Sequence, residues 1–430
     1  MSTLEHGPAL ELVPFLSEER VRAIRRQFGT PVFVYDQKTL EQQARLVLKF
    51  PNAFGLTARY AMKACPTRAV VRVLTQAGLH IDASSGYEAE RAMRAGVPPE
   101  RIQITAQETP HDLKALVEKG VLFNASSVAQ IRAFGELFPG RSLSIRINPG
   151  LGSGHSNRTN VGGPSASFGI WHEYLEDALE AGREYKLKID RVHTHIGSGS
   201  DPEVWQRVAL MSLEICSRVP DARLLSLGGG YKVRRVEGEK TTDLQEIGTY
   251  VMEAFHTFAA RYGRKLHLEV EPGTYLVANA GALITTAVDV VDTGREGYRF
   301  IKVDSGMTEV LRPSLYGAQH PIEVVPSEPG ERDRRDYLVV GHCCESGDTL
   351  TPAPGNPEGL QTRLLKETRI GDAVVIGGAG AYCSGMDAKN YNSFPEAAEV
   401  MILRDGSVRL VRNRQTLDQI VQNEVMPDDL

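Results

Sequence analysis

Short apolar runs recur eight times between residues 58 and 270, and each run ends in polar or small residues. The stretches between them, such as 86–95 and 110–119, have a helical pattern. Strands that alternate with helices form right-handed βαβ units around a parallel sheet. Eight such units predict an α/β fold, a closed (β/α)8 TIM barrel. The runs are Ala58–Met62, Leu79–Ala83, Ile102–Thr105, Val121–Asn124, Leu143–Ile147, Ile189–His195, Leu224–Leu227 and Leu266–Val270.

The sequence pattern changes after Gly281. Short β-branched runs replace the alternation and predict a C-terminal antiparallel β-domain. A barrel takes about 250 of the chain's residues, so we place the barrel at 31–280 and the β-domain at 281–430, with 1–30 packing on the latter. Ser17 is the expected cap of a helix over 17–28. The runs are Leu283–Val291, Arg299–Val303, Tyr337–Gly341, Ala373–Ile376, Glu399–Leu403 and Val408–Arg412.

Composition and charge narrow the class of protein. The 430 residues carry a net charge of −5, so the chain lacks the excess of positive charge that is typical of nucleic-acid-binding proteins,. No apolar run approaches the ~18 residues of a membrane span, and the first residues include acids and lack the apolar centre of a secretory signal. The five cysteines are an odd number in a long chain, which favours reduced thiols,. We therefore expect a cytoplasmic enzyme with no membrane or nucleic-acid partner.

The ends of the predicted strands carry the residues of a possible active site, because barrel sites lie at the C-terminal ends of the strands. Lys63 follows the first strand between Met62 and Ala64, and such apolar neighbours favour a nucleophilic amine,. His193 and His195 point to the same face of a strand, which leaves two interpretations open. In the first interpretation both histidines ligate a metal. In the second, His195 lies flat against an aromatic cofactor.

Two glycine signals follow the last two strands. The run 228–230 predicts either a plain turn or a loop whose N–H groups hold a phosphate. Glu271 and Gly273 stand at the eighth strand, and phosphate sites in barrels often lie after the seventh and eighth strands. A lysine, a histidine, a glycine run and a carboxylate on one rim together indicate pyridoxal 5'-phosphate (PLP) and no metal. The lysine would bind the cofactor, and the carboxylate would keep its ring nitrogen protonated.

From Thr30 to about Gln415 the sequence resembles the fold-type III PLP-dependent decarboxylases, which share the alanine racemase-like barrel, and most closely their diaminopimelate decarboxylase group. The loop Asn148–Ser156 resembles a longer form found in one branch of that group. The motifs that carry the resemblance are Tyr60-Ala-Met-Lys-Ala64, His195-Ile-Gly-Ser198, Gly228-Gly-Gly230, Glu271-Pro-Gly273, Arg312-Pro-Ser-Leu-Tyr316, Cys344-Glu-Ser-Gly-Asp348, Gly380-Ala-Tyr382 and Asn390-Tyr-Asn392.

The resemblance implies a homodimer whose active sites lie at the subunit interface and take a small amino-acid substrate. Cys344, from the partner chain, would return a proton to the α-carbon. The implied cofactor-binding residues are Lys63, Asp82, His195, Ser198, Gly228, Gly229, Gly230, Glu271, Gly273, Thr274 and Tyr382. The implied substrate-binding residues are Arg312, Tyr316, Glu345, Asp348 and Tyr382, and the implied catalytic residues are Lys63, Cys344, His195 and Glu271.

Three departures from the pattern of that group lie near its substrate end. Thr274 stands where the group has an arginine that grips the distal carboxylate of diaminopimelate, Phe394 replaces a second arginine, and the segment between Tyr382 and Tyr391 is one residue longer. A threonine cannot balance a second carboxylate held out of water. These departures predict the D-ornithine/D-lysine decarboxylase branch, whose members make putrescine and cadaverine, the polyamine precursors.

Three alternatives remain open. The first is meso-diaminopimelate decarboxylase, which makes L-lysine and differs only in the distal pocket. The second is a racemase on the same fold, which would keep the carboxylate. The third is a non-catalytic PLP-binding homologue. The presence of Lys63, Cys344 and Glu345 together argues against this alternative.

Overall fold

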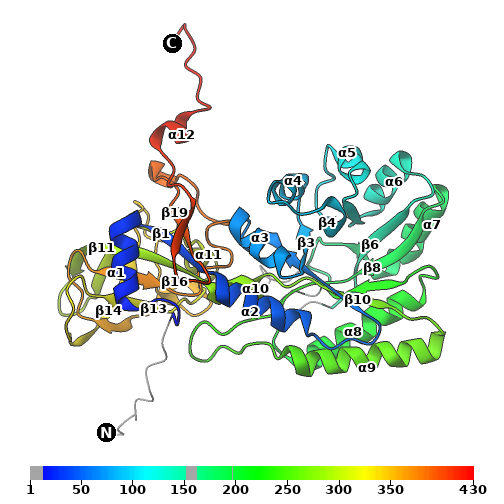
Figure 1. The fold of residues 1–430 in the computed structure, drawn as a ribbon, viewed down its shortest axis with the longest axis horizontal. Helices are drawn as coiled ribbons and strands as arrows, with labels where there is room; N and C mark the ends of the chain where they lie inside the picture. The colour runs from blue at the N-terminus through cyan, green and yellow to red at the C-terminus, as the bar shows by residue number, and fades with distance from the viewer. Residues whose placement is uncertain (1–12, 152–161, 196) are drawn as a thin grey trace. The chain divides into compact units, whose positions relative to one another are not determined.

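The computed structural model describes residues 13–151, 162–195 and 197–430, which fall into two compact units (Figure 1). The barrel unit holds residues 37–278, and the sheet unit combines residues up to 36 with 279–430. The division differs from the expected boundaries, 31–280, at strand β1 (Val32–Asp36). That strand pairs with β11 (Gly281–Asp292) and β19 (Ala398–Ile402), and these backbone hydrogen bonds make it part of the sheet unit.

Eight parallel strands form the barrel, and the predicted (β/α)8 fold is confirmed. Their order is β5-β4-β3-β2-β10-β9-β8-β6, and pairing of β5 with β6 closes the ring. A two-residue strand, β7 (Ile170–Trp171), is added beside β6. Each of the eight apolar runs contains one barrel strand or overlaps it closely. The strands are β2 (Leu56–Ala61), β3 (His80–Ala83), β4 (Ile102–Thr105), β5 (Leu122–Ala125), β6 (Ser142–Asn148), β8 (Lys188–His193), β9 (Leu224–Ser226) and β10 (His267–Val270).

Helices surround these strands in the barrel unit (Figure 1). Ser85 caps α4 and Ser127 caps α6, each by accepting a hydrogen bond from a backbone N–H of the first turn,. The apolar face of each helix is buried, as the pattern of alternating polar and apolar residues predicts. The helices are α2 (Gln37–Leu48), α3 (Arg68–Gln76), α4 (Gly86–Arg94), α5 (Leu113–Glu118), α6 (Val128–Leu137), α7 (Leu175–Glu184), α8 (Pro202–Ser217), α9 (Leu244–Tyr262) and the short α10 (Thr274–Val277).

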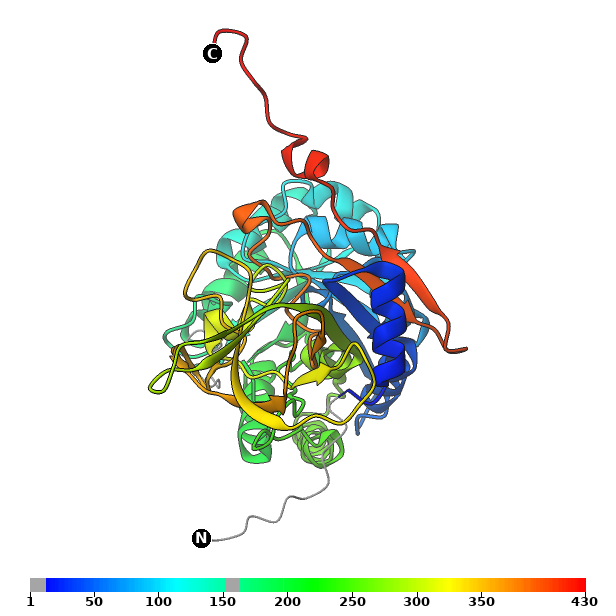
Figure 2. The same ribbon diagram turned by 90° about the vertical axis from the view of Figure 1, so that its left-hand side faces the viewer.

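The sheet unit is built on one nine-stranded sheet (Figure 2). The prediction of an antiparallel domain needs a correction, because β1 pairs in parallel with β19, and β12 pairs in parallel with β14. The strand patterns predict each strand but carry no information on which distant strand becomes its neighbour. The remaining strands are β12 (Arg299–Val303), β13 (Ile322–Val325), β14 (Arg334–Val340), β17 (Arg363–Lys366), β18 (Ala373–Ile376) and β20 (Val408–Arg412), with a separate hairpin of β15 (Pro352–Ala353) and β16 (Asn356–Leu360).

Helix α1 (Glu18–Phe28) packs on this sheet (Figure 2). The Ser17 hydroxyl accepts a hydrogen bond from the Arg20 N–H, as expected for its cap,. Val21 and Ile24 are buried against strands β1, β11 and β19. The sheet unit also contains two short helices, α11 (Arg312–Tyr316) and α12 (Leu417–Val421).

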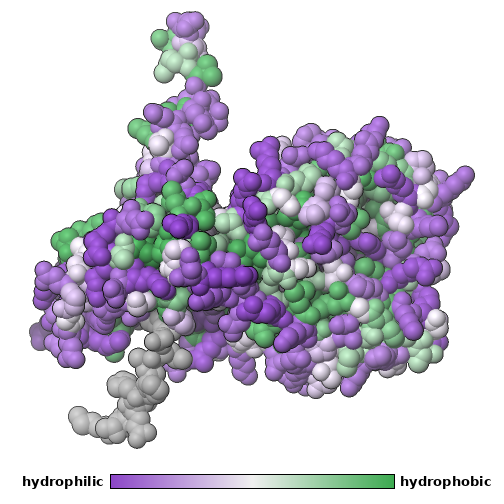
Figure 3. All heavy atoms as spheres, in the orientation of Figure 1, coloured by the Kyte–Doolittle hydropathy of each residue, from purple (hydrophilic) through white to green (hydrophobic). Residues whose placement is uncertain are grey.

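Among the described residues, no helix is both long enough and apolar enough to span a membrane. Hydrophilic and apolar residues are interspersed on the visible face of the barrel unit (Figure 3). Residues 152–156 of the predicted long loop and Ile196 of the histidine motif lie outside the described residues.

Candidate active site

Lys63 stands at the C-terminal end of β2, in a single turn of 3-10 helix over Met62–Ala64. Its Nζ lies 3.3 Å from Asp82 Oδ2 and 3.2 Å from Ser84 Oγ, both at the end of β3. The lysine side chain is 45% exposed, whereas the aspartate is buried. Burial raises the pKa of Asp82 to about 6, although the nearby ammonium group of Lys63 opposes this rise. The barrel therefore presents an accessible amine beside a carboxylate.

Glu271 lies at the end of β10 and has three polar partners inside the barrel. Its Oε2 is 2.8 Å from His193 Nε2, and its Oε1 accepts hydrogen bonds from Ser226 Oγ at 3.0 Å and Gln103 Nε2 at 3.5 Å. Burial by itself would raise the pKa of Glu271, but the charge and the hydrogen bond of His193 outweigh it and hold that pKa well below its usual range. Glu271 is thus a buried carboxylate that stays ionised.

The two histidines of the motif at the end of β8 have different environments. His193 is the last residue of β8 and is buried against Glu271. His195 lies beyond the strand, next to Gly228, where a Cβ would come within 2.8 Å of the imidazole. Burial, and then the charge of Arg146, lower the pKa of His195 well below its usual value, so the ring is neutral. The described residues contain no cluster of three or more potential metal ligands, whereas a neutral ring suits contact with an aromatic cofactor.

The glycine run packs tightly against neighbouring backbone. A Cβ on Gly229 would overlap the carbonyl oxygen of Glu271, and a Cβ on Gly230 would overlap that of Gly197, beside Ser198. Gly230 also has a φ of 104°, which side chains other than glycine's rarely adopt,. These close approaches bring the ends of β8, β9 and β10 together. A plain turn does not require such crowding. Within the run, the Gly228 N–H donates to Ser226 Oγ at 3.2 Å.

Gly273 and Thr274 complete this rim of the barrel. A Cβ on Gly273 would lie 3.3 Å from the side chain of Ala64, so the end of β10 meets the lysine turn directly. Thr274 is the first residue of α10 and is half-buried. The predicted barrel residues thus gather at one edge.

The residues of this edge fit PLP chemically. The site provides an accessible amine for the aldehyde, an ionised carboxylate for the ring nitrogen and a glycine run for the phosphate. Among the described residues, Asp82 Oδ1 and His195 Nδ1 are buried without a hydrogen-bond partner. Buried polar atoms of this kind normally have a partner, and a polar cofactor would provide one.

Sequence reasoning missed three polar residues inside the barrel. Ser226 and Gln103 bind Glu271, and Arg146 on β6 is buried with its Cζ 5.1 Å from the centre of the Phe168 ring. Burial lowers the pKa of Arg146, and the carboxylates of Glu271 and Asp82 oppose that change. The missed signal was a polar residue at every second position of a buried strand, which marks side chains on one face.

The sheet unit carries the second group of predicted residues. Arg312 begins α11 and its Nη1 lies 2.8 Å from His320 Nε2, while His320 Nδ1 lies 2.9 Å from the Gly377 carbonyl oxygen. Tyr316 ends the same helix and is half-buried. Tyr382 has a φ of 56°, a left-handed conformation that is uncommon for a large side chain,.

The Cys344–Asp348 motif forms a tight loop. Cys344 is exposed, and its N–H donates to Asn392 Oδ1 at 3.0 Å. Glu345 is exposed and accepts a hydrogen bond from the Gly347 N–H at 2.9 Å. Asp348 is buried and accepts hydrogen bonds from the N–H groups of Met307 at 2.7 Å and Cys343 at 2.9 Å. In this structure the Asp348 carboxylate holds two backbone loops in place.

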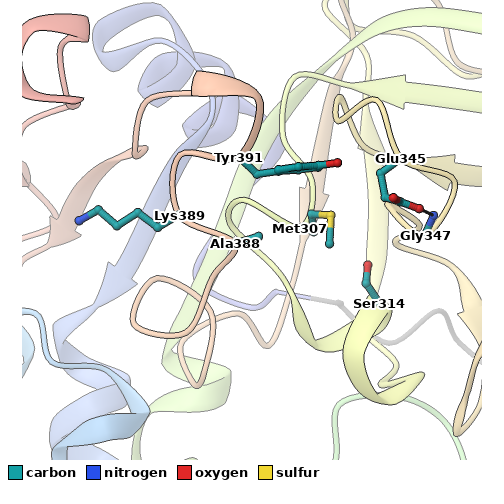
Figure 4. Close-up of a pocket in the computed structure, with 7 residues that line it drawn as sticks. All are labelled: Met307, Ser314, Glu345, Gly347, Ala388, Lys389 and Tyr391. Atoms are coloured by element: carbon teal, nitrogen blue, oxygen red, sulfur yellow. Dashed lines mark hydrogen bonds between the residues drawn. The ribbon is translucent and has the colours of Figure 1, made fainter. Parts of the chain in front are cut away.

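An open pocket of about 530 Å³ lies beside this loop. The ring of Tyr391 extends toward Met307 and Glu345, and Lys389 points away from them (Figure 4). The remaining lining residues are Ser314, Gly347 and Ala388. Phe394, one of the three departures, does not line this pocket. It stacks on His342 with ring centres 3.5 Å apart.

Comparison with known proteins shows which family this chain resembles. Residues 37–278 match the model of the pyridoxal-dependent decarboxylase family, pyridoxal binding domain. The chain is 33% identical to the diaminopimelate decarboxylase of Escherichia coli (strain K12), over 96% of this chain and 97% of that protein. It is 34% identical to the one of Streptomyces coelicolor, over 96% and 93%. A crystal structure of diaminopimelate decarboxylase superposes with a TM-score of 0.89 at 32% identity, covering 97% of this chain and 98% of that one.

Proposed function

The chain belongs to the pyridoxal-dependent decarboxylase family, and from that premise we propose that it removes the carboxylate from the D-configured centre of meso-diaminopimelate to give L-lysine. As a member of the family it is a carboxy-lyase that uses PLP and acts on an amino acid. The proposed substrate is supported by full-length similarity to diaminopimelate decarboxylases, and that similarity is the observation that carries the proposal. It favours the alternative interpretation over the D-ornithine/D-lysine branch.

PLP, when bound, supplies the ring that accepts the electrons left behind as CO2 departs. Lys63 is the proposed covalent anchor, since its amine is accessible at the strand end. Glu271 would hold a proton on the ring nitrogen, because His193 keeps the carboxylate ionised. His195, being neutral, would cover one face of the ring without bringing a competing charge.

The other proposed cofactor contacts follow from position. Asp82 would help to orient Lys63, to which it is paired at 3.3 Å. The backbone of the glycine run would hold the phosphate through the N–H groups of Gly229 and Gly230, because the Gly228 N–H donates to Ser226 Oγ at 3.2 Å,. The remaining proposed contacts in the barrel unit are Ser198, Gly273 and Thr274, and Tyr382 of the sheet unit is proposed from its place in the family motif alone.

The sheet unit would supply the substrate contacts and the acid. Cys344 is the proposed donor of the proton that replaces CO2 on the α-carbon, and its thiol is exposed. Arg312 is the proposed partner of the distal carboxylate. A guanidinium has five N–H donors, and the described residues provide the guanidinium of Arg312 with one hydrogen-bond partner, His320. Glu345 would meet the distal amine.

Asp348 requires a different proposed role from direct substrate binding. Its two oxygens accept hydrogen bonds from backbone N–H groups, so we propose that it shapes the loop that presents Cys344 and Glu345. Because Cys344 is exposed in a single chain, we also propose a homodimer in which each subunit completes the site of its partner.

One observation still favours a substrate with a single carboxylate. Thr274 is half-buried at the rim and brings no positive charge. A D-lysine or D-ornithine decarboxylase is therefore the second candidate. A charge-assisted bond to a carboxylate is worth ~1.5–3 kcal/mol, so the presence or absence of one such bond changes selectivity roughly 10- to 150-fold.

A panel of substrates separates the candidates. CO2 release would be measured with meso-diaminopimelate, D-lysine, D-ornithine, L-lysine and L-ornithine. We expect kcat/KM to be highest for meso-diaminopimelate, and no release from the L-forms. A higher kcat/KM for D-lysine or D-ornithine would overturn the proposed substrate, and amino-acid racemisation without CO2 release would overturn the proposed reaction in this chain.

A further inference from the structure

Three loops of the sheet unit meet at the open pocket (Figure 4). Met307 comes from the loop 305–309, Glu345 from the loop 341–348, and Tyr391 from the loop 388–394. None of these loops is part of a strand or of a long helix. The shape of the pocket therefore depends on the contacts that the loops make with one another.

The rings of His342 and Phe394 form one of these contacts. Their centres are 3.5 Å apart and their planes differ by 7°. His342 Nε2 lies 2.7 Å from Thr308 Oγ1, and the Thr308 hydroxyl donates to Glu309 Oε2 at 2.7 Å. The hydroxyl proton is used by the glutamate, so His342 Nε2–H is the donor in the first bond. The stack thus links the second and third loops and is anchored to the first.

A hydrogen bond repeats this link two residues further along. The Cys344 N–H donates to Asn392 Oδ1 at 3.0 Å. The partners of His342 and Cys344 are thus Phe394 and Asn392, so the pairing runs in antiparallel register. One cross-link is a ring stack and the next is a hydrogen bond. Together they hold the backbone on both sides of residue 343.

The loop 388–394 needs such support because of its backbone conformation. Asn390, Asn392 and Ser393 have φ values of 57°, 52° and 59°. Residues other than glycine persist in this region only when their surroundings hold them there. Loss of the stack would free the end of the loop that carries Asn392, and the bond from Asn392 to Cys344 would be weakened with it.

We propose that the His342–Phe394 stack is a positioning element that fixes the backbone of Cys344 and thereby the direction of its thiol. The proposal rests on the proposed function, in which that thiol returns the proton to the α-carbon. His342 and Phe394 act through Asn392 and the Cys344 backbone. They are positioning residues and take no part in the chemical step.

Burial lowers the pKa of His342 to about 4. The ring is therefore neutral near pH 7, and it packs face to face on Phe394 without the cost of removing a charge from water. A neutral ring also retains Nε2–H for Thr308. The stack is accordingly formed over the whole pH range in which the enzyme would be assayed.

The test uses the PLP-loaded full chain and the variant Phe394→Leu, with Phe394→Tyr as the conservative variant that keeps the ring. Tyr298→Leu removes an exposed aromatic residue outside the three loops and is the matched control. Alkylation of Cys344 by iodoacetamide would be followed by peptide mass spectrometry. Cys344 suits this probe because the other four cysteines are buried or half-buried. The kcat and KM for meso-diaminopimelate, the absorbance of bound PLP and the Tm would be measured in parallel.

We expect Phe394→Leu to raise the alkylation rate of Cys344 and to lower kcat, each roughly two- to ten-fold, as expected for the loss of one aromatic pair. The KM, the PLP absorbance and the Tm should change much less. Phe394→Tyr should stay closer to the wild type than Phe394→Leu does. Tyr298→Leu should match the wild type in every readout.

A second variant, His342→Gln, keeps an amide N–H for Thr308 and removes the ring. It should reproduce the effect of Phe394→Leu on alkylation. Unchanged alkylation and unchanged kcat in these two variants would overturn the proposal. If the wild type releases no CO2 from meso-diaminopimelate, the proposed function fails, while the alkylation rates still report whether the stack positions Cys344.

Discussion

His193 Nε2 lies 2.8 Å from Glu271 Oε2, and at most 5% of either side chain is exposed. This pair places a negative charge inside the barrel at the end of β10, where an isolated carboxylate would otherwise take up a proton. In the proposed mechanism the ionised Glu271 holds a proton on the PLP ring nitrogen. The ionised state of Glu271 therefore depends on its neighbour.

Replacing His193 by phenylalanine should raise the pKa of Glu271, because burial raises that pKa and the charge and hydrogen bond of His193, which oppose it, would be gone. The ionised form of Glu271 would then be lost at a higher pH, so the acid limb of the pH profile of kcat/KM should move upward. A charge-assisted bond is worth ~1.5–3 kcal/mol, so kcat near pH 7 should fall about ten-fold or more. Profiles from pH 5 to 9 would measure both effects, and an unmoved acid limb would contradict the role of the pair.

Lys63→Ala should lose the near-visible absorbance of covalently bound PLP and nearly all CO2 release. Lys119→Ala is a matched control, since Lys119 is similarly exposed, at 50%, and is also paired with a carboxylate, that of Glu90. The control should keep both properties. Full activity in Lys63→Ala would show that the anchor is another residue.

Mixing inactive Lys63→Ala and Cys344→Ala chains tests the shared site. If Cys344 acts in the partner's site, each heterodimer has one intact site of two. Equal mixing yields heterodimers as half of all dimers, which restores roughly a quarter of the wild-type activity. Subunit exchange would be confirmed by native mass spectrometry. Exchange without recovery would place Cys344 in its own subunit's site or outside the chemistry.

Arg312→Leu should lower kcat/KM for meso-diaminopimelate roughly 10- to 150-fold, since it removes the proposed partner of the distal carboxylate. The value for D-lysine, which lacks that carboxylate, should change much less. Arg312→Lys keeps the charge but not the forked geometry of the guanidinium. Its kcat/KM for meso-diaminopimelate should therefore lie between the values for the wild type and for Arg312→Leu. Equal losses of kcat/KM for both substrates would show that Arg312 does not recognise the distal carboxylate.

Glu309→Gln should change how the stability of the protein depends on pH. Burial raises the pKa of Glu309 to about 8 from the 4.5 expected for an exposed glutamate. Between these two values the folded state holds a proton that the unfolded state releases, so the free energy of unfolding falls as the pH rises. Below about 4.5 both states are protonated, and the effect is absent.

The glutamine variant carries no such proton and still accepts the hydrogen bonds that the Gly306 N–H and the Thr308 hydroxyl donate to this position. The slope contributed by Glu309 is at most ~1.4 kcal/mol for each pH unit. Urea unfolding from pH 5 to 8 should therefore show a smaller loss of stability for the variant than for the wild type. Parallel curves for the two proteins would show that Glu309 is already ionised when folded.

The sequence determined the elements of this protein and predicted the edge at which we place the cofactor site. Eight apolar runs predicted eight barrel strands, because strand periodicity and burial are local properties of the chain. Lys63, Gly228 and Glu271 were expected together, since parallel strands bring their C-terminal ends to one rim. The family motifs added PLP and the residues of the sheet unit.

Only the tertiary structure decided the long-range pairings. The parallel pairing of β1 with β19 joins residues that are more than 360 positions apart, and no local pattern specifies it. The ionised state of Glu271 depends on His193, on a strand remote in sequence, and the conformation around Cys344 depends on Phe394 and His342. Charge states and loop positions arise from neighbours in space, whereas the sequence pattern records only neighbours along the chain.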